Sequence, residues 1–260
     1  MKKLALAVVA ACLSFAGSAS AADLAARPYT KAPPPVVAAV YDWSGIYVGG
    51  AVGGIWNDTS GNFYNAPGFG WSTGNHSDWI AGGFAGIQKQ WNYVVVGIEG
   101  GWNGVGNGWG STLGNGIAGP CGFVAGTENC QARISDIGYI GGRLGLAWDR
   151  FMVYGQGGYA RAHINTQGTF VATGVAFSQA SADHDGWYAG VGFDYAVLDY
   201  LVLGVDYKHY EFDSNNHNCN TACLAPFTDN RSVSAKADSV MGRISFKFNP
   251  WPTGPVVARY

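Results

Sequence analysis

The cysteines are the residues of this sequence with the clearest chemistry. The chain contains five of them, and Cys12 falls within an N-terminal leader described below. The other four form two close pairs, Cys121 with Cys130 and Cys219 with Cys223. In an oxidising compartment such pairs predict local disulfides, and a closed loop of about ten residues would add on the order of 2–3 kcal/mol of stability.

A metal ion is the alternative for the second pair. His217, Cys219 and Cys223 have the spacing H-x-C-x3-C, which would suit a soft metal. Structural zinc takes four ligands, and the sequence offers three here. We therefore expect disulfides at both pairs, with no bound metal and no cofactor.

The histidines give little support for catalysis. A hydrolytic site needs a nucleophile, a base and an orienting group, and the segment 209–211 has His209 without a serine beside it. His163 and His184 instead flank a long predicted loop, where two rings could capture haem. We expect a protein that is not an enzyme, and haem capture stays open as the binding alternative.

Composition excludes several classes of protein. Glycine occurs 40 times and 12% of the residues are charged, against roughly 25% in soluble domains. After residue 21 no apolar stretch reaches the ~20 residues of a spanning helix, and the glycines follow no three-residue period. No basic patch indicates nucleic acid. The remaining class is a β-protein rich in glycine and aromatic residues.

The first 42 residues are separate from that β-structure. Lys2 and Lys3, the apolar run 4–15 and an A-x-A site at 19–21 predict a signal peptide over residues 1–21. The exported chain then begins at Ala22. Prolines at positions 28 and 33–35 cannot join a sheet ladder, so residues 22–42 are predicted to be an extended spacer.

The remaining sequence divides into β-like segments joined by links of two kinds. Three links are very short, and the others are rich in Gly, Asn, Ser and Thr. Short turns at one end and long loops at the other are typical of an up-and-down transmembrane barrel. We predict an all-β, eight-stranded antiparallel barrel over residues 43–248, a tail over 249–260, and both termini in the periplasm. The predicted strands are 43–56, 79–90, 94–103, 134–148, 151–164, 186–197, 201–212 and 238–248.

Alternation within the segments supports this prediction. In segment 201–208, Leu201, Leu203, Val205 and Tyr207 alternate with Val202, Gly204, Asp206 and Lys208. Lipid-facing and lumen-facing positions of a barrel require this period of two. A soluble sandwich would instead leave the apolar face exposed to water.

The inward positions carry a set of charges. An eight-stranded barrel is just wide enough for side chains to fill it, so unpaired charges there would be costly and should pair across the lumen. Paired charges would close the lumen, whereas separated charges would line a small ion-selective pore. The predicted interior network is Glu99, Arg143, Asp194, Asp206, Lys208, Arg243 and Lys247.

Aromatic residues are expected at both membrane interfaces. The predicted periplasmic girdle is Trp43, Trp91, Tyr93, Trp148, Phe151, Tyr195, Tyr200 and Phe248. The predicted extracellular girdle is Trp56, Trp79, Trp102, Tyr139, Tyr159, Trp187 and Tyr210.

Several motifs resemble the porin-family outer-membrane β-barrels of rhizobial and related alphaproteobacteria. They are WSGIYVGG at 43–50, VGIEG at 96–100, GRLG at 142–145, YGQGGY at 154–159, GWYAG at 186–190 and RISFKF at 243–248. The resemblance covers essentially the whole mature chain. It implies an OmpA-like eight-stranded barrel of the cell outer membrane with structural, surface and host-interaction roles. Some relatives are described as haem binders or porins, so a small porin stays open beside the haem receptor.

The same resemblance implies partners and two terminal signals. The partners are outer-membrane lipid and lipopolysaccharide, the barrel assembly machinery and peptidoglycan. Assembly signals of this family are terminal aromatic residues, for which Phe248 and Tyr260 are the candidates. Some members are linked to peptidoglycan through the amine of an N-terminal Ala followed by Asp, a pattern that Ala22 and Asp23 match.

Overall fold

The structure is a computed structural model that describes residues 40–63, 66–113, 128–219 and 231–250. These ranges contain ten strands, and within them no helix is long and apolar enough to cross a membrane. The strands are β1 (Gly45–Phe63), β2 (Ala66–Ser72), β3 (His76–Trp91), β4 (Val94–Val105), β5 (Gly110–Leu113), β6 (Glu128–Trp148), β7 (Phe151–Phe170), β8 (Ala176–Ala196), β9 (Leu201–His217) and β10 (Arg231–Phe248).

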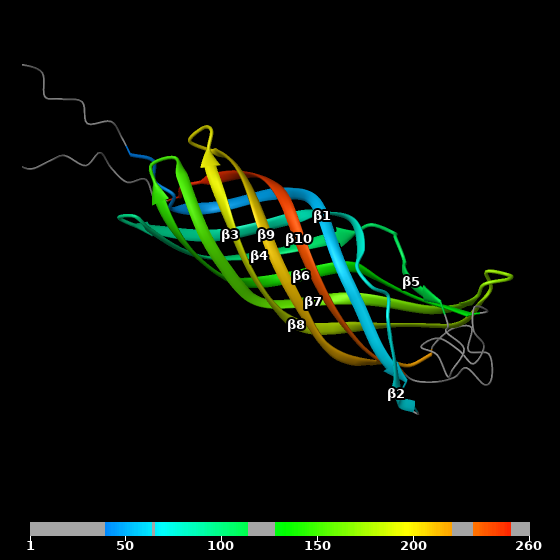
Figure 1. The fold of residues 1–260 in the computed structure, drawn as a ribbon. Helices are drawn as coiled ribbons and strands as arrows, with labels where there is room; N and C mark the ends of the chain where they lie inside the picture. The colour runs from blue at the N-terminus through cyan, green and yellow to red at the C-terminus, as the bar shows by residue number, and fades with distance from the viewer. Residues whose placement is uncertain (1–39, 64–65, 114–127, 220–230, 251–260) are drawn as a thin grey trace, which may run out of the picture. The chain divides into compact units, whose positions relative to one another are not determined.

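Eight long strands form a closed antiparallel ring (Figure 1). Each pairs with the next long strand along the chain, and β10 returns to pair with β1 from Ile46↔Phe248 to Phe63↔Arg231. The short strands β2 and β5 are additions that pair with β1 and β6. Closure leaves no unpaired edge in the ring, as a membrane-spanning sheet requires. The predicted eight-stranded up-and-down barrel is confirmed.

Tight turns connect the strands at the end that we assign to the periplasm. Asn92 lies between β3 and β4 with φ 55°, and Asp149 lies between β6 and β7 with φ 50°. Asn and Asp tolerate this left-handed conformation because their short side chains hydrogen-bond locally. Short turns are a periplasmic feature of such barrels, so the opposite end is extracellular.

The strands run farther toward the extracellular end than predicted. Residues 165–185 were expected to form a long loop, but they extend β7 and β8 and leave only residues 171–175 between the two strands. The period of two continues there, with Asn165 and Gln167 on the outer face and Thr166 buried inside. The outer residues are polar in this extension, so the apolar signal used for the prediction ends before the strand does.

The outer face carries the apolar band predicted from the sequence. Exposed apolar residues alternate along the membrane-facing part of each long strand, for example Val191 and Phe193 on β8 and Leu203 and Val205 on β9. Exposed aromatic residues flank the band: Trp91, Tyr93, Trp148, Phe151, Tyr195, Tyr200 and Phe248 at one end, and Trp56, Trp79, Trp102, Tyr159 and Trp187 at the other.

Three aromatic residues were assigned to these girdles wrongly. Trp43, Tyr139 and Tyr210 are buried, with exposed fractions of 1%, 6% and 0%. Tyr139 and Tyr210 occupy inward positions of the alternation, and Trp43 precedes β1, where alternation does not apply. All three rings contribute to filling the lumen.

Inward glycines make room for those rings. A Cβ on Gly86 would lie 2.4 Å from Tyr47 Oη, and a Cβ on Gly192 would lie 2.5 Å from Tyr154 Oη. Both distances are shorter than any ordinary contact. The high glycine content therefore follows partly from packing tyrosines inside a narrow barrel.

Candidate functional site in the barrel lumen

The middle of the lumen holds a layer of paired charges, here called the charge layer: Glu99, Arg143, Asp194, Asp206, Lys208 and Arg243. Arg243 of β10 is its centre. Its Nη2 lies 2.6 Å from Glu99 Oε2, and its Nη1 lies 2.7 Å from Asp206 Oδ2. Arg143 of β6 donates to Asp194 of β8 and lies 3.5 Å from Glu99 Oε2. Lys208 pairs with Asp206 on β9.

Aromatic side chains complete the solvation of these charges. Glu99 accepts hydrogen bonds from Tyr47 Oη and Tyr139 Oη, each at 3.0 Å. The guanidinium carbon of Arg143 lies 3.6 Å from the centroid of the Tyr154 ring. Buried charges need this combination of partners, because each loses its hydration.

Lys247 was expected in the same network and lies apart from it. Its ammonium group donates to the backbone carbonyl of Asp42 and lies 3.9 Å from the centroid of the Tyr41 ring. Lys247 is four residues closer than Arg243 to the periplasmic end of β10, which places it at the mouth of the lumen. Without Lys247, the charge layer contains three acidic and three basic groups and is formally neutral.

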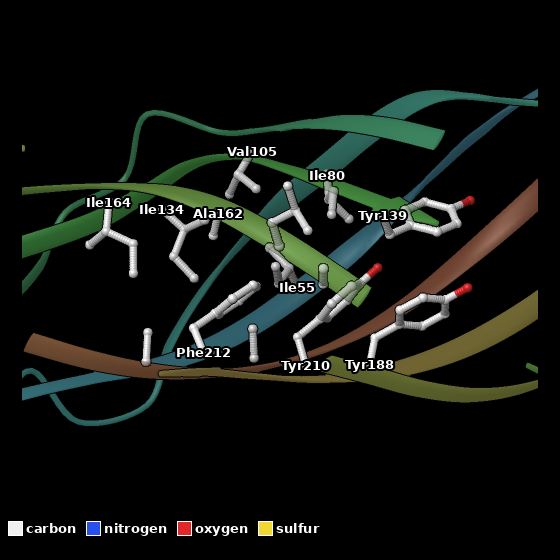
Figure 2. Close-up of a cluster of buried hydrophobic side chains, with 14 of the residues drawn as sticks. Ile55, Ile80, Val105, Ile134, Tyr139, Ala162, Ile164, Tyr188, Tyr210 and Phe212 are labelled. Carbon is white, nitrogen blue, oxygen red and sulfur yellow. The ribbon is translucent and has the colours of Figure 1, made fainter. Parts of the chain in front are cut away.

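An apolar layer fills the lumen on the extracellular side of the charges (Figure 2). Its centre includes Ile55, Ile80, Ile137 and Ile164, each with an exposed fraction of 0%. Tyr139, Tyr188 and Tyr210 are labelled at one end of the same cluster. Sequence reasoning missed this layer, although inward phase along each strand could have identified most of it.

The chain entering β1 closes the periplasmic mouth. Trp43 and Tyr41 are buried in a second cluster that also contains Met152 and Tyr154. Trp43 Nε1 donates to the carbonyl of Asp149 at 2.9 Å. Tyr41, two residues before the predicted start of the barrel at residue 43, also bonds the barrel wall: its amide donates to Asp149 Oδ1 at 3.0 Å.

The same segment is fixed to β3 on its other side. Gln88 Nε2 donates to the carbonyl of Trp43 at 2.7 Å, and the Trp43 amide donates to Gln90 Oε1 at 2.7 Å. These bonds join polar side chains at the periplasmic rim of the barrel to the backbone of Trp43. We call residues 41–44 the floor segment.

The histidines do not form the shared site considered for haem. His163 faces outward, 2.7 Å from Asp183, whereas His184 faces inward and is fully buried. His184 Nε2 lies 2.8 Å from His217 Nε2, and His217 Nδ1 lies 3.0 Å from Thr166 Oγ1. The two loop-flanking rings therefore lie on opposite faces of the barrel wall.

His209, considered for catalysis, and His217 and Cys219, considered for a metal, each have other partners. His209 faces outward and lies 2.8 Å from Asp238, with Glu211 paired instead to Lys236. Both ring nitrogens of His217 are engaged in hydrogen bonds, and Cys219 is disulfide-bonded. In the described part of the chain, no three His, Cys, Asp or Glu residues are arranged to hold a metal ion.

Several predicted site residues fall outside the described residues. They are Ala22, Asp23, Cys121, Cys223 and Tyr260. Cys130 is disulfide-bonded, like Cys219, and the pairing proposed for each stays a prediction. Phe248 ends β10 opposite Ile46 with an exposed ring.

Curated relatives of the chain are outer-membrane proteins of Brucella. The chain is 28% identical over 211 residues to the 25 kDa outer-membrane immunogenic protein of Brucella abortus, which covers 81% of this chain and 84% of that protein. It is 29% identical over 236 residues to the 31 kDa outer-membrane immunogenic protein of Brucella melitensis, with 83% and 89% covered. No protein-family model matches the chain.

Solved structures with a similar arrangement are small outer-membrane proteins. The outer membrane protease OmpT of Escherichia coli aligns with a TM-score of 0.46 and 10% identity, covering 78% of this chain and 97% of that one. OprG of Pseudomonas aeruginosa aligns with a TM-score of 0.44 and 13% identity, covering 81% and 98%.

The relatives bear on two sequence predictions. The predicted resemblance to alphaproteobacterial outer-membrane barrels is confirmed, and so is the predicted location in the cell outer membrane. The closed antiparallel ring with an apolar outer band agrees with both. The chain is an outer-membrane β-barrel protein, similar in sequence to the outer-membrane immunogenic proteins of Brucella.

Proposed function

We propose that this protein is a non-enzymatic structural barrel with a closed lumen. The barrel contributes to the integrity of the outer membrane and exposes its extracellular loops at the cell surface. The filling of the lumen carries the proposal. An apolar layer, the charge layer and the floor segment follow one another along the barrel. A conducting pore would need water to run continuously through all three.

The apolar layer gives the strongest argument against conduction. An ion crossing it would leave water beside fully buried apolar side chains such as Ile55, Ile80 and Ile164. The charge layer adds a second barrier, because its six groups already neutralise one another. The alternative of a small porin therefore has less support than a closed barrel.

Single-channel recording of the refolded full-length protein in planar bilayers tests this proposal. We expect no stable conductance at moderate voltage. A matched variant, Trp43→Ala, removes the largest ring of the floor segment while leaving the apolar layer in place, and should also fail to conduct. Large, stable openings in the unmodified protein would contradict the closed lumen.

We further propose that the N-terminus links the barrel to peptidoglycan. The floor segment holds the start of the barrel at its periplasmic mouth. The sequence predicts an extended spacer over the residues before it, 22–42. At ~3.1 Å per residue, some 20 residues of extended chain would reach about 60 Å. Distance is therefore compatible with attachment through the amine of Ala22, followed by Asp23.

Mass spectrometry of muramidase-digested sacculi tests the link. A muropeptide attached to the Ala22 amine is the expected product. A quantitatively free Ala22 amine, or a mature chain that begins at Asp23, would eliminate the link and leave the closed barrel unaffected. The barrel assembly machinery is, like peptidoglycan, a proposed partner of this chain. Phe248 and Tyr260 are the candidate signals that it would recognise.

A further inference from the structure

The outer face of β6, β7 and β8 changes character beyond the extracellular aromatic girdle. Two rows of polar side chains cross the three strands there, in register. One row is Arg133↔Asn165↔Ser181, and the other is Gln131↔Gln167↔Gln179. All six side chains are half-exposed. We call this surface the amide patch.

Trp109 and the amide patch enclose a depression of about 290 Å³. The Arg133 guanidinium carbon lies 4.9 Å from the centroid of the Trp109 ring, and Arg133 Nη1 donates to Asn107 Oδ1 at 3.0 Å. Arg133 Nε is buried and has no hydrogen-bond partner among the described residues. Gln167 Nε2 donates to Gln131 Oε1 at 2.6 Å, which fixes the orientation of both amides.

This chemistry suits a saccharide. Amide side chains offer donors and acceptors together, which match the hydroxyl groups of a sugar. An aromatic ring presents a flat apolar face, and a guanidinium group binds the carboxylate of an acidic sugar. An acyl chain or an apolar protein surface would bury these amides without supplying hydrogen bonds, which costs free energy.

The height of the patch identifies where the saccharide comes from. Tyr159 is the last girdle residue on β7, and Asn165 lies six residues farther along the strand. At ~3.3 Å per residue and a tilt near 40°, this separation is about 15 Å along the membrane normal. At that height, the neighbour of the outer wall is the sugar portion of the surrounding outer leaflet rather than its acyl chains.

The intervening row gives no comparable site for phosphate. Arg161 Nη2 lies 2.8 Å from Asp183 Oδ2, and Asp185 is a second carboxylate close by. The guanidinium is already neutralised, so an anionic headgroup would meet more negative than positive charge. The row at Arg161 is therefore a poorer site for an anionic headgroup than the amide patch is for a sugar.

We propose that the amide patch binds the core saccharide of lipopolysaccharide in the leaflet around the barrel. Asn165 and Gln167 supply hydrogen bonds, Trp109 supplies the apolar face, and Arg133 pairs with an acidic sugar. The proposal depends only on the barrel's location in the outer membrane and is independent of whether the lumen conducts.

The affinity of the full-length protein in detergent micelles for two probes tests it: rough-type lipopolysaccharide with a complete core, and lipid A without one. The unmodified protein should bind the core-bearing probe about tenfold more tightly. The double variant Asn165→Ala, Gln167→Ala removes the hydrogen bonds of two side chains and should lose about that factor for lipopolysaccharide and nothing for lipid A. Arg133→Gln should lose affinity in the same selective way.

The matched control is Ser232→Ala, Ser234→Ala on the outer face of β10, which should bind both probes as the unmodified protein does. Soluble core oligosaccharide should displace lipopolysaccharide, and dextran should not. Equal affinity of the unmodified protein for both probes would overturn the proposal. So would unchanged binding by the Asn165 and Gln167 variant, or equal competition by dextran, which would indicate a site for free sugars.

Discussion

Removal of the Arg243 side chain is the most direct test of the charge layer. In Arg243→Ala, Glu99 loses two hydrogen bonds, at 2.6 and 3.1 Å, and Asp206 loses one at 2.7 Å. Both carboxylates stay buried, and the layer changes from neutral to one net negative charge. Breaking a buried pair by removing one partner typically costs about 3–5 kcal/mol, because the remaining charge is uncompensated.

The free energy of unfolding in urea, measured in lipid vesicles, gives the readout. Arg243→Ala should fall in that range of destabilisation, and Glu99→Gln combined with Arg243→Gln should lose less because the layer stays neutral. Lys236→Ala is the matched control, since Lys236 is exposed, its partner Glu211 is half-exposed, and surface pairs contribute about 0–1 kcal/mol. If Arg243→Ala is no more destabilising than Lys236→Ala, the pairing argument is wrong.

The other predictions concern closure, pH and the cysteines. Unheated protein in SDS should migrate differently from boiled protein, since a closed ring has no edge from which to unfold; equal mobility would contradict closure. Burial, with smaller contributions from His184 and Arg231, lowers the pKa of His217 from 6.5 to about 3. The unfolded chain therefore takes up a proton at His217 near pH 6.5, whereas the folded chain takes it up only near pH 3. The neutral His217 ring contributes its full stabilisation to the folded state only above pH 6.5. Amide protection at the extracellular ends of β9 and β10, measured as the exchange rate relative to the intrinsic rate at each pH, should fall as pH falls through that window. His217→Gln should weaken this dependence, and burial also lowers the pKa of the neighbouring His184. Peptide mapping without reduction should give Cys121–Cys130 and Cys219–Cys223, whereas four free thiols would refute both.

The sequence predicted the strands best where the outer face is apolar. Segments 201–212 and 238–248 alternate clearly, and their registers in β9 and β10 place Asp206 and Arg243 inside as expected. Beyond the membrane, the outward residues of a strand are polar, as at Asn165, so the sequence there lacks the alternating apolar residues that mark a lipid-facing strand. This is why 165–185 was predicted to be a loop.

Features that depend on contact across the lumen were less accessible. Nothing in the sequence pairs Trp43 with Asp149, because the floor segment bonds a turn more than 100 residues away. Lys247 has the same alternation phase as Arg243, so phase alone placed it in the network. The partner of Lys247 depends on its position along the barrel axis. That position relative to the floor segment follows only from the register of β10 against β1.

The charge layer also has a consequence for assembly. A slip of β10 by one residue would move every side chain of that strand to the opposite face. Arg243 would then enter the lipid, at a cost of about 2–4 kcal/mol near the midplane. Glu99 would simultaneously lose its shortest ion pair, and Asp206 would keep only its pair with Lys208. An apolar interior would seal the barrel equally well but would penalise that slip far less, since leucine or isoleucine is accepted on either face. The central charges therefore specify register, and the apolar layer and floor segment seal the lumen.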